Sequence, residues 1–260
     1  VSPKAVPQLS DAAEVVSALR GRGAVLSALV PNLHGAERAL ETGVDELVMF
    51  VSASEAHNFR NVNRTIAQSL KEVAPVAEAV AKGERVLRAA VPTAFGCPWQ
   101  GNITSEEVAS VIGAFSELGV SAVTLGDTTG MATPPIVRKL CRDLAELFPK
   151  IELTLHFHNT RGIGLVNVVA GLEVGISRYE AALGGIGGCP FAVGASGNIC
   201  TEDLVYLADE IGWETGIDLD RLSLTSKRLQ DVLGYELPGQ IMKSGPRLRT
   251  GIVAERPPEA

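Results

Sequence analysis

Two histidines separated by one residue, His156 and His158, end the apolar run Leu153–Leu155. Residues two apart on a β-strand project from the same face, so both imidazoles would point to one side of a sheet. Such a pair is suited to a divalent metal ion, and the alternative is two histidines held by hydrogen bonds in a polar region. The chain has only 4 histidines, and this spacing favours the metal site.

A carboxylate, Asp127, ends the preceding β-branched run and is followed by Thr128 and Thr129. It could bind a metal ion, accept a proton from a substrate or orient a neighbouring group. The alternative is an aspartate that caps the following turn, which is a common role for this residue type. The residue type and its position leave these interpretations open.

A glycine-rich segment, residues 184–198, contains a single cysteine, Cys189, and ends at Asn198. Glycines allow the backbone to approach a ligand closely and to close over it. A thiol there can transfer protons near neutral pH if its surroundings are electropositive. Alternatively, the backbone N–H groups bind a phosphate and the cysteine is incidental. Asn198 is either a helix N-cap or a neutral oxygen ligand.

Short β-branched runs alternate with helical patterns, which predicts βα units and a parallel sheet. We expect strands at 24–30, 46–52, 85–92, 122–127, 151–158 and 177–183, and helices at 36–42, 64–81, 105–118, 135–148, 164–174, 201–211 and 219–233. Thr104 and Thr201 are expected N-caps. The polar candidates fall at several strand ends, as in a (β/α) barrel, whereas an open sheet gathers its site at one switch point. A barrel domain over 1–237 and a loosely packed tail over 238–260 are therefore predicted.

Bulk properties exclude several classes of protein. The net charge of −7 argues against a nucleic-acid surface, because phosphate binding needs clustered Lys and Arg. No apolar run approaches the ~20 residues that span a bilayer. The 4 cysteines form no CxxC pair, so we expect reduced thiols, with Cys141 in the core. A cytoplasmic protein is expected.

Motifs along the whole chain resemble those of the hydroxymethylglutaryl-CoA lyase family. The matching segments are Pro31–Leu33, Phe95–Pro98, Gly126–Thr128, His156–Thr160, Gly187–Ala192, Gly194–Asn198 and Thr201–Tyr206. Their order and spacing agree with the family as well as their residue types.

The resemblance implies a TIM (β/α)8-type barrel that cleaves 3-hydroxy-3-methylglutaryl-CoA, or a similar thioester, to acetyl-CoA and a keto acid with Mg²⁺ or Mn²⁺. The implied metal ligands are His156, His158 and Asn198, and the implied catalytic residues are Asp127 and Cys189. The residues implied to contact the acyl-CoA are Arg88, Gly187 and Gly188. A homodimer is also implied.

The chain departs from the family pattern in two ways. The Arg-Asp-Gly motif of the family's first strand and the Glu of its second have no match, so we expect the first two βα units to be missing and strands three to eight to be present. The family often has Gly-Tyr where this chain has Ala89 and Ala90, which makes citramalyl-CoA an alternative substrate. Two further hypotheses are a Claisen-condensing synthase of the isopropylmalate or homocitrate type and a catalytically impaired CoA-binding fragment.

Overall fold

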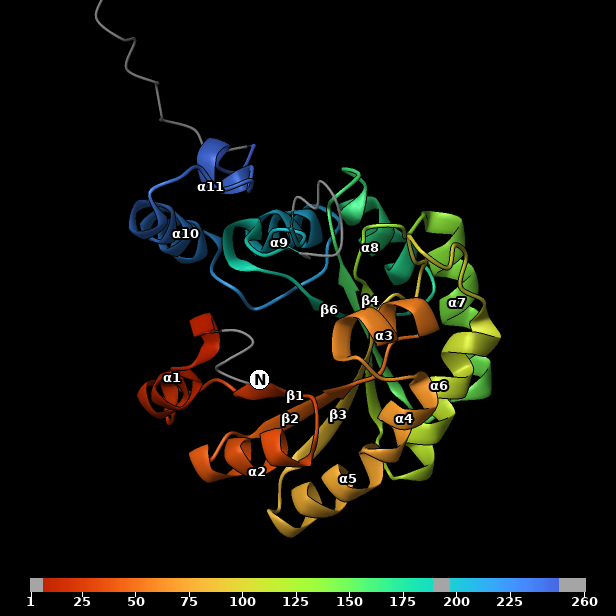
Figure 1. Ribbon diagram of the computed structural model, residues 1–260. Coiled ribbons are helices and arrows are strands. Elements are labelled where there is room, and N and C mark those ends of the chain that lie inside the picture. The colour runs from red at the N-terminus through yellow and green to blue at the C-terminus, as the bar shows by residue number, and fades with distance from the viewer. Residues whose placement is uncertain (1–6, 189–196, 248–260) are drawn as a thin grey trace, which may run out of the picture. The chain divides into compact units, whose positions relative to one another are not determined.

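The computed structural model describes residues 7–188 and 197–247, and every structural statement below concerns these residues. They fall into two compact units (Figure 1). The first unit contains residues 7–180 and the second contains residues 181–188 and 197–247. Each unit is described by itself.

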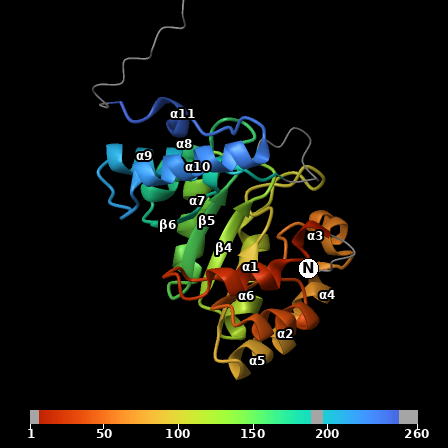
Figure 2. The same cartoon turned by 90° about the vertical axis from the view of Figure 1, so that its left-hand side faces the viewer.

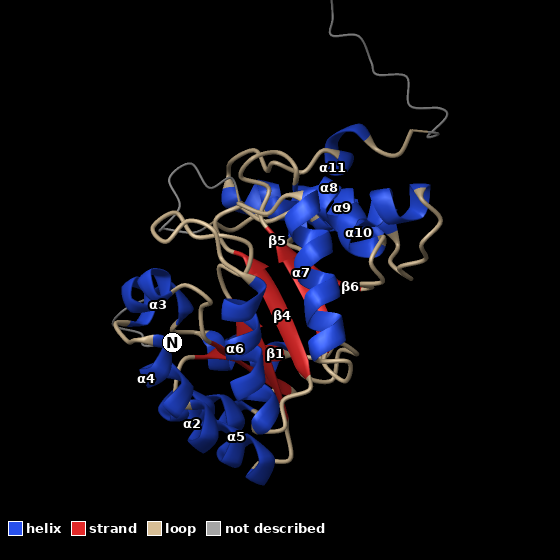
Figure 3. Ribbon diagram, turned by 90° about the vertical axis from the view of Figure 1, so that its right-hand side faces the viewer, coloured by secondary structure: helices blue, strands red, loops and turns tan. Residues whose placement is uncertain are grey.

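The first unit is built on six parallel strands, which confirms the predicted α/β class (Figure 3). The strands are β1 (Ser27–Val30), β2 (Glu46–Phe50), β3 (Val86–Val91), β4 (Ala122–Asp127), β5 (Glu152–Phe157) and β6 (Arg178–Glu180). They pair in sequence order and curl into a half-barrel whose edges are β1 and β6. All six predicted strands are therefore present; β4 has the predicted bounds, and the ends of the other five differ by a few residues.

Alternation along the strands separates an apolar face from a polar one. Leu47 and Met49 on β2 and Ala89 and Val91 on β3 are buried, and they lie at every second position. The opposite face carries polar side chains, such as Thr124, which pairs in register with Thr154 on β5. The apolar face provides the core, and the polar face is available for chemistry.

Helices connect the strands and pack against the apolar face and against one another (Figures 2 and 3). They are α1 (Ala12–Leu19), α2 (Leu33–Thr42), α3 (Glu55–Val62), α4 (Ile66–Lys71), α5 (Val73–Lys82), α6 (Ser105–Glu117), α7 (Pro134–Leu147) and α8 (Gly164–Leu172), with a short 3-10 helix, η1 (Pro7–Leu9). Thr104 caps α6 in a capping box with Glu107, as predicted. The single helix expected at 64–81 is wrong, because α4 and α5 meet at Glu72.

The second unit contains a short 3-10 helix, η2 (Leu183–Gly185), and the helices α9 (Thr201–Glu210), α10 (Leu219–Leu233) and α11 (Ile241–Ser244). The N-cap of α9 is Cys200, so the expected cap at Thr201 is wrong. Ile241 and Met242 are buried, and the Asp203 carboxylate accepts hydrogen bonds from the backbone N–H groups of Gln240 and Ile241. The expectation of loose packing after residue 237 is therefore wrong for this stretch.

None of the helices described in either unit has both the length and the apolar character needed to cross a bilayer.

Candidate metal and catalytic site

The two candidate metal ligands lie side by side at the end of β5. The ring centroids of His156 and His158 are 5.3 Å apart. His158 is 8% exposed, and within the described residues its Nδ1 atom has no hydrogen-bond partner. Burial, with a smaller effect from His156, lowers the pKa of His158 to about 4. The His158 ring is therefore neutral at neutral pH, which is the form that binds metal ions.

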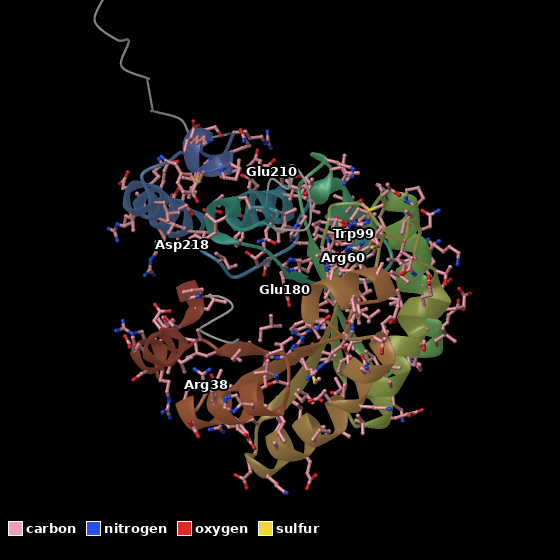
Figure 4. The ribbon with its side chains drawn as sticks, in the orientation of Figure 1. Arg38, Arg60, Trp99, Glu180, Glu210 and Asp218 are labelled. Carbon is pink, nitrogen blue, oxygen red and sulfur yellow. The ribbon has the colours of Figure 1, made fainter. Side chains whose placement is uncertain are left out.

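A carboxylate from the neighbouring strand orients the other imidazole. His156 Nδ1 donates to Glu180 Oε2 at 2.9 Å, and Thr124 Oγ1 donates to Glu180 Oε1 at 2.9 Å. Burial is the largest single effect and acts to raise the pKa of Glu180, but the hydrogen bonds from His156 and Thr124 and the charges of His156 and Arg88 together lower it. A carboxylate on one ring nitrogen leaves the other nitrogen for a metal ion. Glu180, labelled on β6 in Figure 4, was not predicted from the sequence.

Asp127 lies at the end of β4, and its two carboxylate oxygens differ in their hydrogen-bond partners. Its side chain is 2% exposed, and Oδ1 accepts hydrogen bonds from Met131 N at 2.7 Å and Ala132 N at 2.9 Å. Oδ2 is buried and has no partner among the described residues. Burial raises the pKa of Asp127 to about 7, although the two backbone bonds oppose it. One oxygen therefore caps the turn, and the other is free for chemistry.

In the first unit, the imidazoles of His156 and His158 are suited to bind a divalent metal ion. His158 offers a buried, unpartnered nitrogen, and His156 has the carboxylate partner typical of a metal-binding histidine. Within residues 7–188 and 197–247, however, no cluster of three or more His, Cys, Asp or Glu side chains is arranged to hold a metal.

Asn198, the third predicted metal ligand, belongs to the second unit. It is not a helix cap: its Nδ2 donates to Ile186 O at 2.9 Å, and its buried Oδ1 has no partner within the described part of the chain. Gly187, with φ +107°, permits this bond, because a Cβ there would lie 2.6 Å from Asn198 Nδ2. Gly188 is exposed. The amide oxygen of Asn198 is thus available as a neutral oxygen ligand.

Two stretches of backbone approach each other closely beside Asn198. A Cβ at Gly197, where φ is +94°, would lie 2.5 Å from Gly187 O and 2.7 Å from Gly185 O. We call residues 184–188 and 197–200 the two stems, because the chain between them carries Cys189. Cys189 itself lies outside the described residues.

A buried glutamate ties the two stems to α9. Glu202 is 0% exposed and accepts hydrogen bonds from Gly184 N at 3.1 and 3.0 Å. It also accepts one from Cys200 Sγ at 2.6 Å. Its carboxylate therefore holds one residue of each stem.

Arg88, predicted to contact the acyl-CoA, lies within a charged layer on the polar face of the sheet. Its guanidinium is 3.4 Å from Glu152 Oε1 and 3.9 Å from Glu46 Oε2, and it donates to Thr154 Oγ1 at 3.2 Å. Arg178 also pairs with Glu152, at 2.8 Å. These contacts hold Arg88 in place, and its contact with substrate stays a prediction.

An exposed cation–aromatic pair follows the ends of β2 and β3. Arg60 on α3 lies 4.7 Å above the ring of Trp99, and Figure 4 labels both. The pair is at the carboxyl ends of its strands, as His156 is. Sequence analysis did not single it out, because nothing in the spacing of these two residues relates them.

Comparisons with known proteins identify the family of this chain. The HMGL-like family model matches residues 2–229. Over 248 residues the chain is 40% identical to hydroxymethylglutaryl-CoA lyase YngG of Bacillus subtilis, covering 94% of this chain and 83% of the relative. Over 257 residues it is 40% identical to (R)-citramalyl-CoA lyase of Chloroflexus aurantiacus, covering 95% and 81%.

A solved structure supports the same assignment at the level of the fold. The structure of an HMG-CoA lyase from Acinetobacter baumannii, in complex with coenzyme A and 3-methylmalate, superposes with a TM-score of 0.91 at 46% identity. The match covers 96% of this chain and 82% of that chain. The half-barrel therefore corresponds to the TIM-barrel-like fold of these lyases. This chain belongs to the HMGL-like family.

Proposed function

We propose that this protein is a divalent-metal-dependent carbon–carbon lyase. It cleaves 3-hydroxy-3-methylglutaryl-CoA, or a similar 3-hydroxyacyl-CoA such as citramalyl-CoA, to acetyl-CoA and a keto acid. The observation that carries the proposal is the pair of imidazoles, His156 and His158, at the end of β5, together with the Asp127 carboxylate at the end of the neighbouring strand β4, whose Oδ2 atom has no partner among the described residues. The relatives named above act on thioesters of this kind, as their names state.

His156, His158 and Asn198 would hold Mg²⁺ or Mn²⁺. When bound, the cation supplies Lewis acidity that makes the substrate hydroxyl easier to deprotonate. Glu180 fixes the orientation of the His156 ring through its 2.9 Å hydrogen bond. The low pKa of His158 keeps that ring neutral and able to bind at neutral pH.

Asp127 is proposed to accept the proton of the substrate hydroxyl. Its Oδ2 atom has no other partner among the described residues, and its pKa of about 7 suits a base that works near neutral pH. Loss of that proton lets the carbon–carbon bond break, which releases the keto acid and leaves the enolate of the acetyl thioester. Cys189 is proposed to donate a proton to the enolate carbon, which gives acetyl-CoA. Arg88, Gly187 and Gly188 are proposed to contact the acyl-CoA.

We further propose that two βα units complete an eight-stranded barrel. The support is the open sheet, because β1 and β6 each pair on one side only within the described residues. Apolar side chains on β1 and on the chain that precedes it are exposed, namely Val15, Leu19, Val25 and Leu29, and two additional units could cover them. A barrel domain ending at residue 237, cytoplasmic location and assembly as a homodimer stay predictions.

An intact mass of the polypeptide isolated from its natural source tests the barrel proposal. The 260 residues have a mass of 27.3 kDa. Two additional βα units add about 7 kDa, at roughly 30 residues a unit. A mass higher by that amount supports the completed barrel, and a mass of 27.3 kDa contradicts it.

A substrate panel tests the activity. The protein would be incubated with Mg²⁺ or Mn²⁺ and, separately, with the thioesters of 3-hydroxy-3-methylglutarate, citramalate and 3-methylmalate, and each keto acid would be measured. Thioester-dependent release that a chelator abolishes supports the proposal. Condensation of acetyl-CoA with a 2-keto acid, without cleavage, would instead favour the synthase hypothesis. Thioester binding without turnover of any substrate would favour the impaired fragment.

A further inference from the structure

A side chain from the loop after β5 is bonded to the backbone of the loop after β4. Arg161 is an exposed residue three positions after His158. Its Nη1 atom donates to Thr129 O at 2.9 Å and to Gly130 O at 2.6 Å. These carbonyls come two and three residues after Asp127. We call these two bonds the Arg161 bridge.

The two loops are also in direct contact beneath the bridge. Gly130 has φ +64°, and a Cβ there would lie 2.6 Å from Thr160 Cβ. This closeness allows only a glycine and fixes the separation of the two backbones. A second connection comes from α8, where Asn167 Nδ2 donates to Ala132 O at 3.0 Å.

The bridged loop in turn holds the carboxylate of Asp127. The backbone N–H groups of Met131 and Ala132 donate to Oδ1, and Gly130 N donates to Asp127 O at 3.0 Å. A shift of residues 129–132 would therefore rotate the carboxylate and move its free Oδ2 atom. Arg161 therefore holds Asp127 in place through this backbone, and its positive charge also acts to lower the pKa of the Asp127 carboxyl.

We propose that Arg161 is a positioning residue that fixes the free oxygen of Asp127 relative to the imidazole of His158. The proposal rests on the proposed function, because it assigns Asp127 the role of proton acceptor. Both carbonyls could be hydrated if Arg161 were absent, so its loss should affect stability little. A misplacement of about 1 Å at a reacting group, by contrast, can reduce the rate by about 10²-fold.

The test compares Arg161→Ala and Arg161→Lys with Arg142→Ala, an exposed arginine on α7. Steady-state kinetics of the metal-loaded enzyme would separate kcat from KM. Hydrogen exchange at the Met131 and Ala132 amides would report on the loop without any substrate. For Arg161→Ala we expect kcat to fall about 10- to 100-fold with KM unchanged, and exchange at these amides to become faster. Arg161→Lys should restore part of the lost kcat and part of the protection of these amides from exchange. Arg142→Ala should behave as the wild type.

Three outcomes would overturn the proposal. A raised KM with unchanged kcat would mean that Arg161 contacts the substrate, and unchanged kinetics would mean that the bridge does not position Asp127. Unchanged amide exchange in Arg161→Ala would mean that the bridge does not hold the loop. If the wild-type protein cleaves none of the thioesters, the proposed function fails by itself, and the exchange comparison then still decides whether the bridge holds the loop.

Discussion

Replacement of Glu202 by alanine should destabilise the second unit strongly. The substitution removes the acceptor for Gly184 N–H and for the Cys200 thiol, both of which are buried. A buried backbone donor that loses its partner costs about 1–3 kcal/mol, and the cavity left by a fully buried side chain adds to this. We expect a total loss of about 2–4 kcal/mol in the free energy of unfolding. Glu202→Gln keeps one oxygen acceptor and should lose about half as much.

The chain contains a convenient probe for this measurement. Its 2 tryptophans are divided between the units, with Trp99 in the first and Trp213 in the second. In a Trp99→Phe background, the fluorescence of Trp213 during urea denaturation reports on the second unit. Glu210→Ala is the matched control, because Glu210 is on the same helix but forms an exposed ion pair with Arg247 at 2.6 Å.

The control should show no measurable loss of stability, since exposed ion pairs contribute little. If Glu202→Ala unfolds at the same urea concentration as Glu210→Ala, the buried carboxylate does not hold the stems and the reasoning is refuted. A loss seen by Trp213, and not by Trp99 in a Trp213→Phe background, would locate the effect in the second unit.

Four further predictions concern the candidate site. His158→Ala should weaken Mn²⁺ binding at least about 10-fold by isothermal titration calorimetry, and His34→Ala, at an exposed position, should not. Because burial raises the pKa of Asp127 to about 7, the carboxylate forms only as pH rises through that value. The kcat/KM of the wild type should therefore increase with pH up to about pH 7. Asp127→Asn removes the proton acceptor and should abolish the activity. In metal-free buffer, the unfolded chain loses the Asp127 proton near the usual aspartate pKa of about 4, whereas the folded protein retains it up to about pH 7. The wild type should therefore lose stability relative to Asp127→Asn as pH rises from about 4 to about 7, which melting temperatures would show. An equal difference in melting temperature at about pH 4 and about pH 8 would contradict this. Cys189→Ser should lower kcat by about 10²-fold with no change in melting temperature, and wild-type kcat would exclude the thiol from proton transfer.

Secondary structure was predictable where local pattern determines it. The bounds of β4 and α10 are the same as those predicted, because a β-branched run and a capped amphipathic stretch are local signals. The break between α4 and α5 was missed, although Pro75 in the expected helix was a signal for it. Proline is tolerated in the first turn of a helix and not in its interior, so α5 starts at Val73. The helix α1 was also missed; its apolar residues, such as Val15 and Leu19, are exposed, and none of its residues is buried.

The candidate site was predictable only in part. The pairing of His156 with His158 follows from the two-residue period of a strand, which is local. The role of Glu180 does not, because it depends on the register that places β6 beside β5 and on a hydrogen bond from Thr124, 56 residues away. Likewise, the sequence left open whether Asp127 caps a turn or does chemistry, and the structure shows that its two oxygens differ in this respect.

The close approach of Gly187 and Gly197 has a consequence for how this protein can evolve. The two stems hold the ends of the segment between them close together. Contacts within the stems therefore already offset the entropy cost of bringing these ends together. Lengthening such a loop costs little, about 0.6 kcal/mol for each doubling. Insertions and substitutions between the stems can therefore accumulate with small effects on folding, whereas the two glycines, whose backbones touch, cannot be replaced.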